Sequence, residues 1–359
     1  AEVAADGSSV IGKHDGTGGQ VSIGTVTSQL LYEIGGPRYL GPDVTARFDT
    51  IALEEVGADR VRISGVRGEA PPATLKVAMN ELGGYRNEVS IMLTGLDIDA
   101  KAEVASAAFW EACPHDPDDL ASVTERVERT DHADPASNEQ ATATWRLVVK
   151  DPDERKVGRA FSNAMVETAL SSIPGLYGGG GPSGASPYGV YRPALVPADL
   201  VPAHVTVLGG DTHEVPSTFP GADVAPVEPA PGPVTAAPAG PTTALPLGTL
   251  VGARSGDKGG DANLGVFVRD DLAWEWLDEL LTTDRLRELL PETADLPIDR
   301  HPLPNLRSVN FVIRGLLQEG VAASTRNDGQ AKSLGEWLRA RVADIPDALL
   351  GERGHGIPL

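Results

Sequence analysis

Cysteine and long hydrophobic runs are nearly missing from this sequence. Cys113 is the single cysteine in 359 residues, which excludes an internal disulfide and any cysteine-based zinc or iron–sulfur site. It ends an apolar stretch before Pro114, where a buried small side chain is favoured over a nucleophile. We expect a reducing, cytoplasmic location. Since no apolar run approaches the ~20 residues that cross a bilayer, no membrane span is predicted.

Positive charge is scarce as well. The sequence has 30 Lys and Arg residues against 51 Asp and Glu residues, a formal net charge of −21. A surface this acidic repels phosphate backbones and anionic lipids, so nucleic-acid binding is not expected as a main role. Hydrophobic residues make up 41% of the chain, which indicates a globular protein with room for two or three domains.

The familiar catalytic and cofactor motifs are also absent. In residues 252–267 an aspartate, Asp257, precedes Lys258 and no Ser or Thr follows it, so this is not a nucleotide-binding P-loop. Residues 177–193 formally contain G-x-G-x-x-G, but a predicted helix precedes the motif and Pro182 interrupts it, so a ligand-covering loop or a plain surface loop is expected. The histidines show no metal-binding spacing; no metal site is predicted and no cofactor is assigned.

A proline-rich stretch divides the chain. Residues 220–246 carry eight prolines with Ala, Gly and Thr between them, a composition that favours polyproline II or loose coil. We therefore expect a larger mixed α/β domain over residues 1–219, this segment as a linker, a small domain over 247–350 and a tail over 351–359.

The first domain is expected to mix helices and strands. Asp99 is a plausible N-cap, and Gly83–Tyr85 is expected to lie at a turn between two strands. The periodicity of apolar residues predicts helices over 25–34, 99–113 and 156–173, and strands over 60–66, 73–79, 87–95, 141–151 and 203–210.

The second domain shows a more compact pattern. Strands are predicted over 247–255, 262–269 and 308–317, the last with Val309, Phe311 and Ile313 on one face. Helices are predicted over 272–290 and 333–345. Two helices on one face of a small, mostly antiparallel sheet form an α+β sandwich of ferredoxin-like type.

The strongest candidate for ligand binding is the stretch GARSGDKGGDANLGVF, residues 252–267. Its five glycines can turn successive backbone N–H groups toward one anion, beside the cations and the amide that the stretch supplies. The alternative is an irregular hairpin with solvated charges. The candidate residues are Arg254, Asp257, Lys258, Asp261 and Asn263.

Two further loops are weaker candidates. Arg67 and Lys76 lie in a loop that follows a predicted strand, where they suit a carboxylate or phosphate. His14 and Asp15 lie in a glycine-rich loop, and a His–Asp pair can serve general acid–base catalysis. In both places an exposed turn is the alternative.

Four stretches together resemble the acyclic terpene utilization (AtuA) family. They are KHDGTGGQVSIGTVTSQLLYEIGGPRYLGPDV, DRVRISGVRGEAPPATLKV, GARSGDKGGDANLGVFVR and DGQAKSLGEWLRARVADIP. The resemblance covers almost the whole chain apart from the linker, and it implies an appended ferredoxin-fold domain at the C-terminal end. The family is associated with bacterial breakdown of acyclic terpenoids such as citronellol and geraniol, and is often encoded beside acyl-CoA carboxylases.

The resemblance implies an enzyme or enzyme subunit that acts on an acyl-CoA or a terpenoid acid. The alternative is a non-catalytic partner or scaffold of an acyl-CoA carboxylase complex, and a homo-oligomer is also open. Family members carry a further α/β region ahead of residue 1, so the chain is expected to be a C-terminal portion. The resemblance supplies no catalytic residues, and the reaction stays unassigned.

Overall fold

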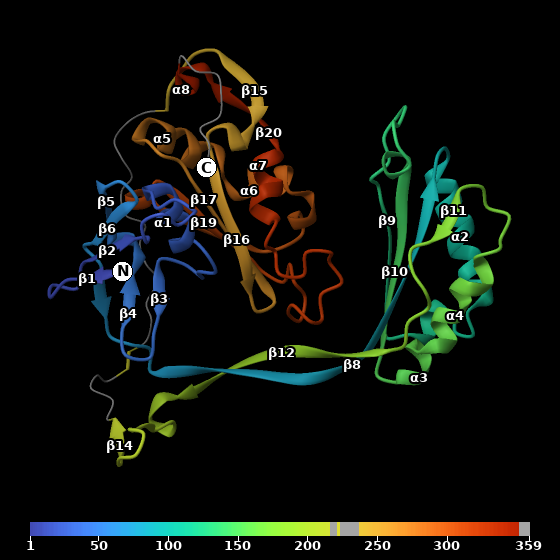
Figure 1. Cartoon of the computed structure of the whole chain (residues 1–359), viewed down its shortest axis with the longest axis horizontal. Helices are drawn as coiled ribbons and strands as arrows, with labels where there is room; N and C mark the ends of the chain where they lie inside the picture. The colour runs from blue at the N-terminus through green and yellow to red at the C-terminus, as the bar shows by residue number, and fades with distance from the viewer. Residues whose placement is uncertain (216–220, 223–236, 352–359) are drawn as a thin grey trace. The chain divides into compact units, whose positions relative to one another are not determined.

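The computed structural model describes residues 1–215, 221–222 and 237–351 (Figure 1). The chain divides into two compact units: the first unit comprises Ala1–Met79 and Tyr191–Leu359, and the second unit comprises Asn80–Val190. This division cuts across the predicted boundary at the proline-rich segment, because the N-terminal residues pack with the C-terminal part of the chain. The predicted domain boundaries stay a prediction.

Two small antiparallel sheets and one helix form the N-terminal part of the first unit. Ser22 caps the helix α1: the Thr25 N–H donates to its side chain over 3.3 Å, and its own N–H donates to the Thr25 hydroxyl over 2.9 Å. The elements are β1 (Glu2–Val3), β2 (Ser9–Gly12), α1 (Ile23–Leu30), β3 (Arg38–Leu40), β4 (Thr45–Arg47), β5 (Ala52–Gly57), β6 (Arg60–Ser64) and β7 (Arg67–Glu69), in sheets of order β1-β2-β6-β5 and β3-β4-β7.

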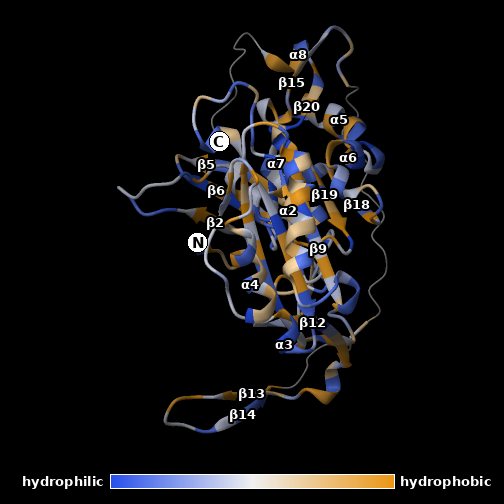
Figure 2. Ribbon diagram, turned by 90° about the vertical axis from the view of Figure 1, so that its right-hand side faces the viewer, coloured by the Kyte–Doolittle hydropathy of each residue, from blue (hydrophilic) through white to orange (hydrophobic). Residues whose placement is uncertain are grey.

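The rest of the first unit is built on a four-stranded antiparallel sheet of order β16-β17-β19-β18. Hydrophobic residues run along β19 and α7 (Figure 2). The elements are β13 (Ala203–Thr206), β14 (Thr212–Val215), β15 (Thr242–Pro246), β16 (Gly252–Lys258), β17 (Asp261–Phe267), α5 (Asp271–Leu280), α6 (Thr283–Leu289), β18 (Ile298–Leu303), β19 (Ser308–Ile313), α7 (Leu334–Ala340), β20 (Val342–Pro346) and α8 (Asp347–Leu350). Helices packed with antiparallel sheets confirm the predicted mixed α/β (α+β) fold class.

The two faces of this sheet pack against different parts of the chain. Alternate residues of β17, namely Ala262, Leu264 and Val266, are fully buried in the core that the helices α5, α6 and α7 share. Val309, Phe311 and Ile313 of β19 belong to the same core, as predicted. The opposite face of β17 meets the N-terminal segment, since Phe267 clusters with Leu31 and Ile34.

The second unit is a sheet covered by helices. Its aromatic core centres on Phe109, whose ring centroid lies 5.7 Å from that of Trp145 and 5.2 Å from that of Phe161. Cys113 is buried there, and burial raises the pKa of its thiol. The elements are β8 (Thr74–Thr94, which begins in the first unit), α2 (Ile98–Ala112), β9 (Ser122–Glu128), β10 (Thr142–Asp151), α3 (Glu154–Val157), α4 (Arg159–Thr168), β11 (Leu176–Gly178) and β12 (Ser186–Pro197), with sheet order β11-β8-β10-β9 and β12 pairing with β8.

The predicted turn at Gly83–Tyr85 is wrong, because β8 runs through it without a break. A Cβ atom on Gly83 would lie 2.4 Å from the ring of Tyr188, and one on Gly84 would lie 2.9 Å from the carbonyl oxygen of Asp151. These glycines therefore permit close packing inside a strand, and they do not mark its end.

Several predicted helices are shorter than expected. The helix predicted over 272–290 is two helices, because the Arg285 N–H donates to the Thr282 side chain over 3.1 Å and α6 begins there. The helix predicted over 333–345 ends at Ala340, and β20 follows it. The 156–173 helix is likewise split into α3 and α4. Asp97, and not Asp99, occupies the N-cap position of α2.

The predicted linker is partly strand. Its last five residues form β15, which pairs with β20 from Thr242↔Pro346 to Pro246↔Val342. Ala222 forms a parallel bridge with Pro72. Of the other linker residues, 220 and 223–236 lie outside the described residues, and so does the tail beyond residue 351.

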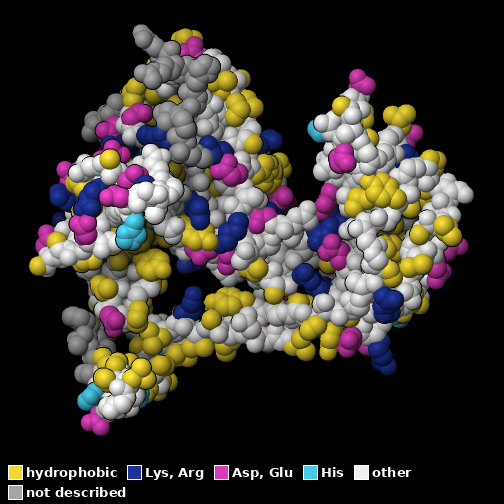
Figure 3. Space-filling view, viewed as in Figure 1, with side chains coloured by type: hydrophobic (Ala, Val, Ile, Leu, Met, Phe, Trp, Pro, Cys, Tyr) yellow, Lys and Arg dark blue, Asp and Glu magenta, His cyan; other side chains and the backbone are white. Residues whose placement is uncertain are grey.

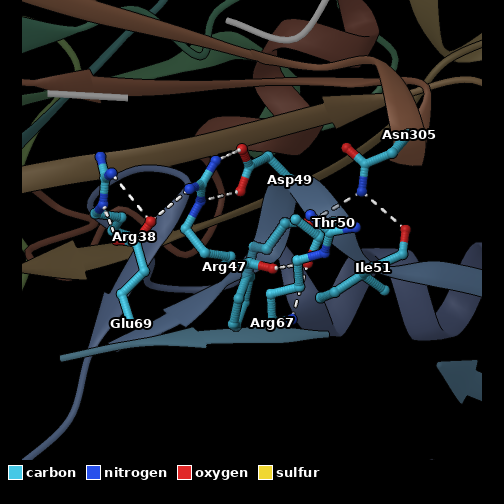
Figure 4. A network of polar contacts seen from close by, with 9 residues as sticks. Arg38, Arg47, Asp49, Thr50, Ile51, Arg67, Glu69 and Asn305 are labelled. Carbon is cyan, nitrogen blue, oxygen red and sulfur yellow. Dashed lines mark hydrogen bonds and ion pairs between the residues drawn. The ribbon is translucent and has the colours of Figure 1, made fainter. Parts of the chain in front are cut away.

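An ion-pair network joins the strands β3, β4 and β7 (Figure 4). Glu69 pairs with the guanidinium groups of Arg38 and Arg47, and Arg47 also pairs with Asp49. Hydrogen bonds from the two arginines lower the pKa of Glu69 to about 2. The charged form of Glu69 is therefore the form that the fold stabilises.

We predict that Glu69→Gln lowers the free energy of unfolding at pH 7 by about 1 kcal/mol, a figure reduced for the partial exposure of the pair. Because the folded-state pKa is depressed, this contribution is present above about pH 4.5 and disappears as the pH falls toward 2. Urea unfolding of both proteins between pH 7 and pH 3 measures the difference. Glu54→Gln, in the exposed pair with Arg62, is the control and should change little. A Glu69→Gln deficit that is independent of pH would contradict the prediction.

Candidate functional site

The glycine-rich stretch 252–267 is a regular hairpin. Strands β16 and β17 pair without a break from Gly252↔Phe267 to Lys258↔Asp261, and the turn consists of Gly259 and Gly260 alone. Gly259 has a φ of 72°, which explains a glycine at that position. This regular ladder pairing does not favour the predicted anion nest, and the hairpin is more regular than the irregular one that was its alternative. Ligand binding by the residues of this stretch stays a prediction.

Two glycines of the hairpin let the N-terminal segment approach the sheet. A Cβ atom on Gly265 would lie 2.4 Å from the Cβ atom of Leu31, and one on Gly256 would lie 2.8 Å from the Cγ atom of Glu33. Larger residues would push the end of α1 away from the strands. The glycines are thus explained by contact with another part of the same chain.

Glu33 is held by three residues of the ferredoxin-like part. Its N–H donates to the Asn263 side-chain oxygen over 2.7 Å, and its carbonyl oxygen accepts from the Lys258 ammonium group over 2.6 Å. Its carboxylate pairs with Lys332. Its φ of 58° is left-handed, an uncommon conformation for a residue other than glycine, and these bonds stabilise it. We call these four residues the Glu33 clamp.

The side chains of the clamp carry coupled charges. Burial disfavours the ammonium of Lys332, yet hydrogen bonds to Glu33, Tyr32 and Asp257 hold its pKa above the usual value. Burial also opposes the charge of Glu33, but its bonds to Lys332 and Tyr32 keep its pKa below the usual value. Burial, and next the nearby charge of Lys76, lower the pKa of Lys258.

Asn263 is the most deeply buried member of the clamp. It is fully buried, and its amide donates to the side-chain oxygen of Asn310 on the neighbouring strand. Since both ends of the amide are used inside the protein, Asn263 acts in holding Glu33.

The other sequence candidates lie in different surroundings. Asp261 pairs with Arg314 over 2.9 Å and accepts from the Gly315 N–H. Arg67 is exposed, and its backbone N–H donates to the Thr50 hydroxyl over 3.0 Å (Figure 4). His14 and Asp15 are exposed on the N-terminal loop. The structure therefore brings together Arg254, Asp257, Lys258 and Asn263, with Lys76 close enough to affect Lys258. Catalysis by His14 and Asp15 stays a prediction.

A cavity of about 700 Å³ opens beside the clamp, and we call it the α1 cavity. It lies between α1, the strands β16 and β17 and the start of α7. Its wall combines hydroxyl groups, two aromatic rings and three cations with one carboxylate. The lining residues are Ser22, Gly24, Thr25, Ser28, Gln29, Tyr32, Ala253, Arg254, Ser255, Phe267, Arg269, Lys332, Gly335 and Glu336.

Arg254 is a cation of this wall that pairs with no carboxylate among the described residues. Its guanidinium carbon lies 4.4 Å from the centroid of the Tyr32 ring, and none of the described carboxylates forms an ion pair with it. Lys332 lies over the same ring at 4.5 Å, but it is already paired. Glu336 pairs with Arg339 over 2.8 Å. The wall thus offers one guanidinium to an anion.

A second cavity of about 340 Å³ adjoins the first. The two share Ser22, Gly24, Phe267 and Arg269, so the first turn of α1 stands between them.

The described residues contain no cluster of three or more His, Cys, Asp or Glu side chains that is arranged for a metal ion. They also include no helix with the length and apolar character that a membrane crossing requires.

Sequence reasoning missed Tyr32, Glu33, Arg269 and Lys332. All four lie within the stretches that carry the family resemblance, and Lys332 is one of only seven lysines, but neither fact assigns a contact. Glu33 and Asn263 are 230 positions apart, so no local pattern pairs them.

The comparisons with known proteins agree with the resemblance. A model of the acyclic terpene utilisation family protein AtuA matches residues 1–207, and a model of the AtuA ferredoxin-like domain matches residues 245–343. Neither the curated proteins nor the solved structures gave a significant match.

We predict that Gly265→Ala lowers the free energy of unfolding by about 1–3 kcal/mol, because the added methyl group overlaps Leu31 and the backbone must shift. Urea unfolding followed by tryptophan fluorescence measures the change. Gly18→Ala is the matched control, since a Cβ atom there meets no atom within 4 Å. Equal stability of the two variants would show that α1 does not pack closely on the hairpin.

Proposed function

The chain belongs to the acyclic terpene utilisation (AtuA) family, and on this premise we propose that it is an enzyme, or a subunit of one, that binds an anionic acyl ligand in the α1 cavity. The ligand class is an acyclic terpenoid acid or its CoA thioester. Cytoplasmic action is part of the proposal, because a chain with one buried cysteine suits a reducing compartment. The reaction is left unassigned.

The observation that carries the proposal is Arg254. Among the described residues this guanidinium has no carboxylate partner, although the chain carries 51 acidic residues and a net charge of −21. Its position on the wall of a cavity gives it a use, because a guanidinium binds a carboxylate or phosphate through two parallel hydrogen bonds. The stacking on Tyr32 fixes the orientation of the group before any ligand arrives.

The remainder of the wall suits a ligand with an apolar part. Phe267 and Tyr32 offer aromatic surface, and Ser28 and Thr25 offer hydroxyl groups. A volume of about 700 Å³ lies within the roughly 300–1,000 Å³ of small-molecule sites. A branched hydrocarbon chain with one charged end matches this combination of surfaces.

The alternative is a non-catalytic partner of an acyl-CoA carboxylase. The exposed apolar side chains of residues 195–215 favour an interaction role for this protein. Titration with ligand separates the alternatives, because the scaffold needs no small-molecule site. A chain that binds none of the acids or thioesters would favour the scaffold.

We predict that the chain binds acyclic terpenoid acids or their CoA thioesters and that Arg254→Gln weakens binding roughly tenfold or more, as expected for the loss of a charge-assisted hydrogen bond. Isothermal titration calorimetry measures the dissociation constants. Arg285→Gln is the control, since Arg285 is paired with Glu288 on α6 and does not line the α1 cavity. Unchanged thermal unfolding of Arg254→Gln excludes a folding defect. Equal affinities of the two variants would remove the α1 cavity from the proposal.

A further inference from the structure

Residues 195–215 form a projecting segment that we call the apolar arm. It ends in the hairpin of β13 and β14, which pair from Ala203↔Val215 to Thr206↔Thr212. Hydrophobic side chains gather over the hairpin region in Figure 3. The exposed apolar residues are Leu195, Leu200, Val201, Val205, Val207, Leu208 and Val215, with exposed fractions from 47% for Val201 and Val215 to 99% for Leu208.

Among the described residues, the two strands of the hairpin pair with each other and with no third strand. All eight strand residues are exposed, and β13 and β14 form a separate two-stranded sheet. An isolated hairpin of two strands is marginally stable at best in water. In the part of the chain that the structure describes, the arm is attached at its base, where it continues from β12, which pairs with β8, and where the Ala198 N–H donates to the Ala73 carbonyl oxygen over 3.0 Å. A covered arm is therefore the stable state of this segment.

The charges of the arm identify the edge that a second copy can use. The arm contains no Lys or Arg, and its acidic residues are Asp199, Asp211 and Glu214. Glu214 lies on β14, so two β14 edges would bring like charges together. The strand β13 carries no carboxylate, and its outer edge has unpaired peptide groups among the described residues. Two β13 edges can pair without that repulsion.

The size of the patch fits a dimer interface. A Val or Leu side chain presents roughly 60–120 Å² of apolar surface, so the seven partly exposed side chains offer roughly 300–500 Å². Since a little over half of a typical interface is apolar, coverage of all seven side chains would correspond to roughly 500–900 Å² for each partner, an upper bound for this patch. Standard interfaces bury about 800 Å² for each partner. A twofold axis also places the same patch on both sides, as a self-complementary surface requires.

We infer that the apolar arm is a dimerisation element, in which β13 pairs antiparallel with β13 of a second copy of this chain. The added pairing joins two marginal hairpins into a four-stranded sheet, and it makes Val205 of each arm a cross-strand neighbour of the other arm. The inference does not depend on the α1 cavity or on any ligand.

Sedimentation equilibrium of the full chain tests the inference. The parent protein is expected at twice the chain mass of 37.5 kDa at micromolar concentration. Val205→Lys places a charge beside the twofold axis and Leu208→Asp removes the most exposed apolar side chain, so each should raise the dissociation constant at least tenfold. Leu170→Lys is the control, because Leu170 is 95% exposed in the second unit and should leave the dimer intact. Circular dichroism checks that every variant is folded.

Thiol crosslinking detects the dimer even if a charged variant does not fold. Cys113 is buried, so Val205→Cys adds an accessible thiol on β13. A short bismaleimide should link this variant into dimers and leave Leu170→Cys monomeric. The inference is overturned by a parent chain that stays monomeric, by an arm that pairs only with a different protein, or by Val205→Lys and Leu170→Lys dimerising equally.

Discussion

The attachment of Glu33 to the ferredoxin-like sheet is the interaction on which the described site depends. The peptide of Glu33 donates to Asn263 and accepts from Lys258, while its carboxylate pairs with Lys332. These contacts fix both the backbone and the side chain of one residue. Because α1 ends at Leu30, three residues before Glu33, these contacts also hold α1 against β16 and β17, and so define a wall of the α1 cavity.

The same constraint explains which charges are available to a ligand. Lys258 and Lys332 appear in the sequence as free cations, but the structure uses both in binding Glu33. Arg254 lies on the same strand as Lys258, and its guanidinium stacks on the Tyr32 ring. Two lysines thus hold the chain's own Glu33, while the guanidinium of Arg254 lines the cavity. This division of roles supports an anion site beside the clamp, and not within the hairpin turn.

The alternation and spacing of neighbouring residues predicted correctly which side chains of a strand face the core. The alternation of apolar residues in 308–317 placed Val309, Phe311 and Ile313 correctly, because side chains of a strand point alternately to its two faces. The fold class and the family were also predictable. The proline-rich composition predicted a linker over residues 220–246. The last residues of that segment nevertheless pair with β20, about 100 positions away, and no local pattern indicates so distant a partner.

The errors at the two glycine-rich stretches have one physical cause: glycines serve in close contacts whose partners are distant in sequence. Gly83 and Gly84 appeared to mark a turn, although they admit Tyr188 and Asp151 against an unbroken strand. Gly256 and Gly265 appeared to form an anion nest, although they admit Glu33 and Leu31. A glycine-rich stretch with mixed charges is therefore ambiguous between binding a ligand and binding another segment of its own chain.

Hydrogen exchange at the Glu33 amide tests the central claim most directly. The amide is bonded to the fully buried Asn263, so it should be protected in the parent protein although it follows the end of a short helix. In Asn263→Ala it should exchange at least ten times faster, while the amides that pair β17 with β19 stay protected. An exchange rate at Glu33 that is unchanged by Asn263→Ala would contradict the account.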